Sequence, residues 1–159
     1  MPVSDDEVFE RYPDVLITYD NIAHYRGLLE RRLLVNRCDD CGYWIYPHRP
    51  LCPRCWSWSV TPTEVSGQGR IHLLTRIRHT RANDPVAQRR GTLVLIAVEL
   101  AEQPGLRYLS TVDGVEFEDL RHDMPVELTW IDRDGLPAPV FRPAPVDQEA
   151  ELSQEAPVG

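Results

Sequence analysis

Four cysteines are the residues of this sequence whose types and spacing point most directly to chemistry. Every cysteine of the chain lies in the stretch CDDCGYWIYPHRPLCPRC, as two Cys-x-x-Cys pairs ten residues apart: Cys38, Cys41, Cys52 and Cys55. Four thiolates from two such pairs can surround one tetrahedral Zn²⁺, with Zn–S distances of about 2.3 Å. All four positions are then protein ligands, so no position stays open for a reactive water. The pattern therefore predicts a structural zinc ribbon of the rubredoxin-like kind.

Other uses of the same four thiols remain open at this point. Iron in the cage would make a rubredoxin-type electron carrier, and two disulfides or a metal-free dithiol also fit the spacing. The first ten residues, MPVSDDEVFE, lack a signal-peptide pattern, and the chain has no run of eighteen apolar residues. We therefore expect a cytoplasmic protein without a membrane span. In the cytosol disulfides are rare and paired Cys-x-x-Cys units usually hold metal.

The residue after each cysteine pair affects how the backbone folds around the sulfur atoms. Gly42 follows the first pair and lets the chain turn back, so that N–H groups can point at sulfur. Trp56 occupies the matching place after the second pair. Its backbone is less free, which brings one N–H···S bond of that knuckle into question.

The elements around the cysteines indicate a mainly β chain. Apolar residues at helical spacing predict a helix within 18–36, with Asp20 able to cap its start. After the cysteine unit, alternating or apolar runs bounded by turn residues predict five short strands. They span 70–80, 92–100, 106–113, 125–132 and 138–144. Five such strands suggest an OB-type barrel, although periodicity alone equally allows a small sandwich.

These elements divide the chain into five segments. We expect a flexible N-terminus and, at the other end, a disordered acidic tail, because both are polar and rich in acids. The segments are 1–17 (flexible N-terminus), 18–36 (helical), 37–66 (zinc ribbon), 67–146 (OB-fold domain) and 147–159 (tail).

Several stretches of the sequence resemble one known family, the acyl-CoA-associated zinc-ribbon/OB-fold proteins. They are RCDDCGYWIYPHRPLCPRC, EVSGQGRIHLLTRIRH, LVLIAVELAEQPGLRYLSTV, DMPVELTW and APVFRPA, within residues 20–144. Members are small subunits found with thiolase-like or MaoC-like hydratase enzymes. Two places depart from the family pattern. HYRGL stands where a Phe-Trp pair is common, and Asp123 stands where glycine is usual.

The resemblance implies both a fold and a function. The fold is an N-terminal helical hairpin, a rubredoxin-like zinc ribbon and a five-stranded OB-fold barrel. The function is that of a non-catalytic accessory subunit of a thiolase-like enzyme, which would be an acyl-CoA carbon–carbon bond lyase, an aldolase or an acyltransferase. Helix and ribbon would dock on that enzyme, and the barrel would help to form or cover its acyl-CoA site. A MaoC-like enoyl-CoA hydratase is the alternative partner, and lipid or steroid acyl chains are candidate substrates.

Arginines are the candidate contacts to coenzyme A or to the partner. The chain has no lysine, and residues 26–90 hold twelve arginines against five acids although the net charge is −8. Such guanidinium groups could bind the phosphates of a coenzyme A thioester or an acidic partner surface, or could simply keep a strand edge soluble. The candidates are Arg49, Arg76, Arg78, Arg81, Arg89 and Arg90.

Two other classes of protein are alternatives to the accessory subunit. A nucleic-acid module could use the arginines with Trp44, Trp56 and Trp58, but the net charge of −8 opposes a broad phosphate-binding surface. An independent enzyme would need a catalytic set of its own. The five histidines lie beside no evident nucleophile, the serines form no recognisable elbow, and the cysteines are committed to the metal. We therefore expect no catalytic residue in this chain.

Overall fold

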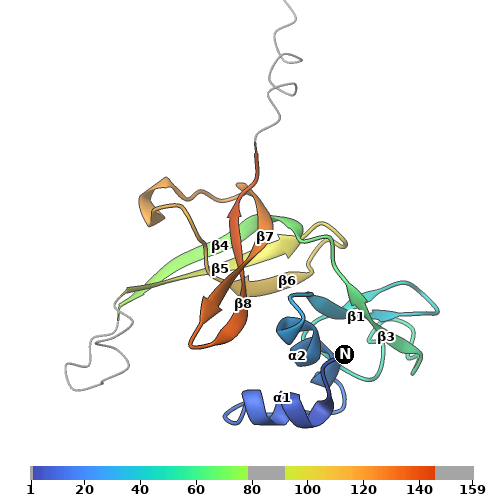
Figure 1. Ribbon diagram of the computed structural model, residues 1–159. Coiled ribbons are helices and arrows are strands. Elements are labelled where there is room, and N and C mark those ends of the chain that lie inside the picture. The colour runs from blue at the N-terminus through green and yellow to red at the C-terminus, as the bar shows by residue number, and fades with distance from the viewer. Residues whose placement is uncertain (1, 79–91, 146–159) are drawn as a thin grey trace, which may run out of the picture.

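The computed structural model describes residues 2–78 and 92–145 (Figure 1). Two helices precede a small three-stranded sheet, and a larger five-stranded sheet follows. The elements are α1 (Asp5–Arg11), α2 (Ile22–Leu29), β1 (Leu34–Cys38), β2 (Trp44–Ile45), β3 (Val60–Glu64), β4 (Gln68–Arg78), β5 (Thr92–Leu100), β6 (Arg107–Ser110), the 3₁₀ helix η1 (Phe117–Asp119), β7 (Pro125–Arg133) and β8 (Leu136–Pro143).

Helix α1 lies in the segment that we expected to be loosely ordered. Ser4 caps it by accepting a hydrogen bond from the Glu7 N–H, and acidic residues occupy its first turn, where the helix dipole favours them. Val8 is fully buried, and Arg26 of α2 forms an ion pair with Asp5. The acidic composition that suggested disorder is instead the N-terminal turn of a short amphipathic helix.

Helix α2 confirms the predicted helix but is shorter, and the proposed cap is wrong. Its N-cap is Asn21, which makes no capping bond with its side chain, and not Asp20. The helix ends at Leu29 because the chain folds back over Gly27, whose carbonyl accepts a 2.7 Å bond from the Arg32 N–H. A Cβ on Gly27 would lie 2.7 Å from the Arg32 carbonyl oxygen, so this close return needs glycine.

The five-stranded sheet is OB-like, as the sequence predicted. Its strand order is β6-β5-β4-β7-β8, with every neighbouring pair antiparallel. The chain after β6 then meets β8 in a parallel bridge between Val112 and Phe141, which curls the sheet towards closure. The five predicted strands all occur, with ends that differ by a few residues. The small sheet, of order β2-β1-β3, carries the cysteines.

One hydrophobic core joins the helices, the ribbon and the barrel. Its buried residues come from α2, from β1 and its flank, and from all five barrel strands; the largest fully buried side chain is Phe141. The cluster comprises Leu28, Leu33, Val35, Val65, Ile71, Ile96, Val98, Leu100, Leu106, Tyr108, Leu120, Val126 and Phe141. The helices in Figure 1 therefore close one end of the barrel instead of standing apart from it. Within the described ranges, no helix has the length and apolar character to cross a membrane.

His24 is a buried titratable group in this junction. It is 6% exposed, its Nδ1 lies 2.9 Å from the Leu34 carbonyl oxygen, and its ring centroid lies 4.6 Å from that of His48, with the rings tilted at 45°. Burial, and to a smaller extent the neighbouring His48, lower the pKa of His24 from 6.5 to about 4, although the bond to Leu34 partly offsets both effects. The folded protein therefore holds His24 neutral.

This burial predicts an acid-sensitive stability. The unfolded chain binds the His24 proton more tightly than the folded protein, so the contribution is complete above pH 6.5 and is lost as the pH falls towards 4. Urea unfolding should show a loss of about 2 kcal/mol from this group between pH 7 and pH 4.5. The variant His24→Gln should be less stable at pH 7 but should lose correspondingly less on acidification. Equal slopes for both proteins would contradict the assignment.

Gly69 marks the closest approach between two barrel strands. A Cβ there would lie 2.5 Å from Val98 Cγ1 and 2.6 Å from the Glu99 carbonyl oxygen, and backbone cannot move aside cheaply. Gly69→Ala should therefore lower the free energy of unfolding by about 3 kcal/mol in urea titrations. Gly114→Ala is the control. Gly114 has a φ of +73° and open space around it, so only the left-handed strain of about 1 kcal/mol applies.

Candidate metal centre

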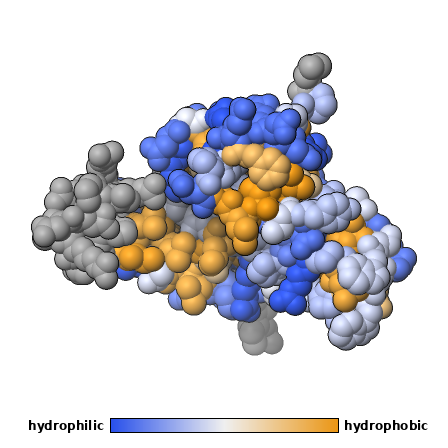
Figure 2. Space-filling model, turned by 90° about the horizontal axis from the view of Figure 1, so that it is seen from below, coloured by the Kyte–Doolittle hydropathy of each residue, from blue (hydrophilic) through white to orange (hydrophobic). Residues whose placement is uncertain are grey.

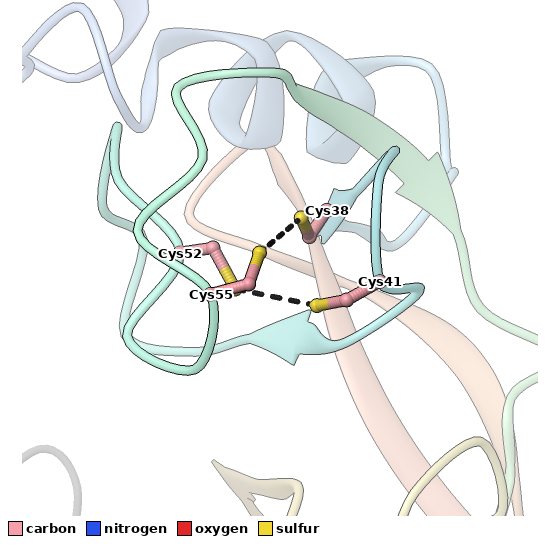
Figure 3. Close-up of side chains that lie close together, drawn as sticks. All are labelled: Cys38, Cys41, Cys52 and Cys55. Atoms are coloured by element: carbon pink, nitrogen blue, oxygen red, sulfur yellow. Dashed lines mark hydrogen bonds between the residues drawn. The ribbon is translucent and has the colours of Figure 1, made fainter.

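The four cysteine sulfur atoms converge at the tip of the ribbon (Figure 3). Cys38 ends β1, and the other three lie in the turns on either side of β2. All four sulfur atoms lie within 4.8 Å of one another, with Cys38–Cys55 and Cys41–Cys52 each at 3.6 Å. A tetrahedron with Zn–S bonds near 2.3 Å has S···S edges of about 3.8 Å. A disulfide needs about 2.05 Å, so the arrangement fits a metal and not paired disulfides.

The two knuckles are built alike, and the N–H···S bond that Trp56 brought into question is present in the second one. The Tyr43 N–H donates to the Cys41 sulfur, and the Ser57 N–H donates to the Cys55 sulfur. Gly42 has a φ of 72° and Trp56 has a φ of 62°, so tryptophan adopts the left-handed conformation that glycine takes in the first knuckle. The N–H···S bond is thus kept, and the cost is backbone strain at Trp56.

Backbone N–H groups also prepare Cys52 as a thiolate. Burial raises the pKa of this thiol, but the N–H groups of Cys55 and Arg54, together with the neighbouring thiols of Cys41 and Cys55, lower the pKa to about 7. Zinc binds the thiolate form, so this lowering favours metal near neutral pH. The chemistry of this donor set is that of a closed structural site, with sulfur at all four positions.

The ribbon tip has little else to hold it together. Its apolar cluster consists of Cys38, Ile45 and Cys52, with Tyr43 and Val60 packed against them. A cluster of this size cannot offset the conformational entropy of the turns between Cys38 and Cys55. When zinc is bound, it supplies the cross-link that this part of the chain needs.

Two polar side chains that the sequence analysis missed fix the ribbon against the rest of the molecule. The amide of Gln103, in the turn between β5 and β6, accepts from the Trp44 N–H at 2.9 Å and donates to the Trp44 carbonyl at 3.2 Å. Asn36 is 4% exposed and donates to the carbonyls of Asp20 and Arg49. Both act on backbone groups far away in sequence, so no local pattern could have pointed to them.

The structure separates the candidate arginines instead of gathering them. Arg49 is exposed and lines a cleft of about 240 Å³ between ribbon and barrel, together with Trp44 and Gln103. Arg76 is engaged within the barrel, with Nη1 2.9 Å from Glu118 Oε1 and its guanidinium 4.9 Å from the centroid of the Phe117 ring.

The other arginines give less information. Arg78 ends β4, two residues beyond Arg76. Arg81, Arg89 and Arg90 lie outside the described residues.

Three of the four described histidines contact backbone carbonyls with their rings. His24 and His48 both approach the Leu34 carbonyl oxygen, and His122 approaches the His72 carbonyl. In residues 2–78 and 92–145, the one group of three or more metal-binding side chains is the cysteine cluster. The expectation that this chain has no catalytic residue stays a prediction.

The contrast between Gly42 and Trp56 yields a test of the knuckle geometry. Trp56→Asn should make the zinc-loaded protein more stable by about 1 kcal/mol, because asparagine tolerates the left-handed region and the tryptophan side chain is 73% exposed. Gly42→Ala should destabilise it by a similar amount. Thermal unfolding with and without chelator measures both. A destabilised Trp56→Asn would show that the indole makes a contact that the strain argument omits.

Comparisons with known proteins agree with this architecture. Residues 26–60 match the ChsH2 rubredoxin-like zinc ribbon domain. The solved structure of an Ltp2-ChsH2(DUF35) aldolase contains a chain with a TM-score of 0.69 and 30% identity, covering 82% of this chain and 99% of that one. A crystal structure of a DUF35 protein of unknown function from Sulfolobus solfataricus, with a TM-score of 0.55 and 13% identity, supports the fold alone.

Curated relatives point in the same direction. A probable enoyl-CoA hydratase alpha subunit from Thermomonospora curvata is 31% identical over 139 residues, or 87% of this chain, but this chain spans only 42% of that protein's length. A DUF35 domain-containing scaffold protein from Pyrococcus furiosus is 29% identical over 119 residues, or 71% of this chain and 83% of its own length. Ribbon, barrel and near-complete coverage of the aldolase chain together show that the present chain belongs to the ChsH2/DUF35 zinc-ribbon family.

Proposed function

We propose that this chain is a non-catalytic accessory subunit that docks on a thiolase-like acyl-CoA enzyme and helps to form or cover its acyl-CoA site. One observation carries the proposal. The chain matches 99% of a chain from an Ltp2-ChsH2(DUF35) aldolase at 30% identity, and so has the size and fold of a protein that works within an aldolase assembly. The structural contacts of His24, His48 and His122 support a scaffold role.

The zinc in this proposal is structural. Cys38, Cys41, Cys52 and Cys55 would hold one Zn²⁺, which would keep the ribbon tip folded next to the barrel. Free thiols arranged for a metal also support a cytoplasmic location, where such sites are common and disulfides are rare.

Coenzyme A is the candidate small ligand of the assembled complex. Arg49 makes no side-chain hydrogen bond or ion pair with another described residue, and it lines the cleft beside Trp44 and Tyr46. A guanidinium next to aromatic side chains could bind a phosphate and an adenine ring. Arg76 is the weaker candidate, because Glu118 already neutralises it.

A second candidate partner is a MaoC-like enoyl-CoA hydratase. The observation in its favour is the 31% identity to a probable enoyl-CoA hydratase alpha subunit over 87% of this chain. The scaffold role would be the same in this case, and the reaction would change.

The decisive experiment isolates the partner and then rebuilds the complex from pure proteins. Tagged chain is used to purify partners from its native cell extract, and the acyl-CoA enzyme subunit identified by mass spectrometry is produced separately. Wild type should carry one zinc per chain and bind this subunit. Turnover of acyl-CoA should require the partner and should be absent from the present chain alone.

Two variants separate the role of the metal from that of the surface. Cys38→Ser should lose zinc and expose the ribbon to protease, because Cys38 links β1 to the metal, and its effect on partner binding measures how far the complex depends on a folded ribbon. Arg54→Ser, at an exposed position in the second knuckle, should retain zinc and binding. Turnover by the isolated chain, or salt-sensitive binding of single-stranded nucleic acid with no enzyme partner, would overturn the proposed function.

A further inference from the structure

Strand β5 is apolar on both of its faces, although only one face lies in the core. Ile96 and Val98 point inward and are fully buried. Leu93, Leu95 and Ala97 alternate with them and therefore lie on the other face, where Leu93 and Leu95 are half-buried and the small Ala97 is 6% exposed between its neighbours. A strand that is apolar on both faces is typical of a sheet that is covered on both sides. The described part of the chain covers one.

The neighbouring strands extend this outward surface. Residues directly opposite each other in antiparallel strands share a face. Leu73 of β4 lies opposite Ala97, which lies opposite Leu109 of β6, and this makes one apolar row across three strands. Two further rows are Thr75 with Leu95 and Ile77 with Leu93. The outer apolar face is thus formed by Leu73, Thr75, Ile77, Leu93, Leu95, Ala97 and Leu109.

A bulge in β4 creates this surface. The register shifts between Ile71 and Leu73, so that Ile71 is fully buried in the core while Leu73 is 48% exposed. In a regular strand two residues that are two apart would share a face. The bulge at His72 therefore turns a leucine outward that would otherwise have joined the core. Ile77 is 40% exposed and Leu109 is 58% exposed on the same side.

A groove borders the outer apolar face. Strand β6 ends at Ser110, opposite Ile96, so no described strand pairs with the edge of β5 before that residue. A groove of about 290 Å³ opens there, between this edge and the β7–β8 hairpin, and Leu95, Leu109 and Pro139 are among its lining residues. Figure 2 shows hydrophobic side chains gathered beside the grey segment 79–91, where β4 and β5 lead into it.

Charges around the face indicate what kind of surface would cover it. One end is bordered by a cross-strand row of Arg70, Glu99 and Arg107, with two guanidinium groups for one carboxylate. This described row carries a net positive charge. A partner with an apolar patch bordered by carboxylates complements it.

We propose that the outer apolar face is the surface by which this chain docks on the acyl-CoA enzyme subunit, a claim that rests on the proposed function. The partner presents an apolar patch that covers the three rows, one side chain that enters the groove, and acidic residues that meet Arg70 and Arg107. The barrel wall is then the docking element. The family resemblance had assigned docking to the helix and ribbon.

The test places a charge on the exposed row of the face that adjoins Arg70, Glu99 and Arg107, without disturbing the fold. Leu109 is 58% exposed in the free chain, so Leu109→Glu should leave the thermal unfolding temperature unchanged and should bind the purified partner subunit about a hundredfold more weakly. Leu73→Glu should have a similar effect. Leu109→Lys should bind more tightly than Leu109→Glu, because a lysine meets the acidic border. Isothermal titration calorimetry measures all of these affinities.

Leu16→Glu is the matched control. Leu16 is 82% exposed between α1 and α2, away from the outer apolar face, and this variant should bind like wild type. If wild type binds and Leu109→Glu binds equally well, or if Leu16→Glu is the variant that fails, the docking surface proposed here is wrong while the accessory function stands. If wild type itself does not bind, both proposals fail. Sedimentation equilibrium should show a monomer, and a dimer that Leu109→Glu dissociates would identify a second copy as the occupant.

Discussion

The organisation of this molecule depends on the need to neutralise four sulfur atoms that lie within 4.8 Å of one another. Four thiolates at this separation repel one another strongly unless a cation lies between them. The ribbon tip has a very small apolar cluster, so the metal that these ligands fit also supplies most of its cohesion. Cys38 is the last residue of β1, and Val35 of the same strand is fully buried in the main core. The metal therefore anchors one end of a strand whose other end is held by the barrel.

This shared strand makes ribbon and barrel one scaffold. Gln103 and Asn36 reinforce the junction by bonding to backbone groups from distant parts of the chain, and His24 adds a neutral imidazole at the end of the core. Buried polar groups of this kind fix one arrangement of the parts, because any other arrangement would leave them unsatisfied. Rigidity of this kind suits the proposed role of a subunit that positions another protein's active site. Its contribution would be orientation and exclusion of water.

The sequence predicted those features that depend on local pattern and missed those that depend on tertiary contacts. Cysteine spacing predicted the metal centre, and alternation between turn residues predicted five barrel strands. Helix α1 was missed because its acidic first turn resembles a disordered segment, and burial of Val8 depends on tertiary contacts such as those with α2. The left-handed backbone of Trp56 could not be predicted from the sequence. It follows from a contact of the next residue, because the N–H of Ser57 must reach the Cys55 sulfur. Asp123 likewise keeps a φ of 60°, where the family usually has glycine.

Strand β5 shows that a sequence pattern can also depend on contacts with another subunit. The run TLVLIAVEL is nearly continuous in apolar residues, which is the pattern of a strand buried on both faces. Folding of the described chain satisfies half of that pattern, and the bulge at His72 adds Leu73 to the half that remains exposed. A barrel that stays alone in solution would be more soluble with polar residues at these positions. The adjoining row of Arg70, Glu99 and Arg107 is polar in this way. The leucines and the isoleucine on these three adjacent rows are therefore explained by the surface of a partner subunit, which the isolated chain does not contain.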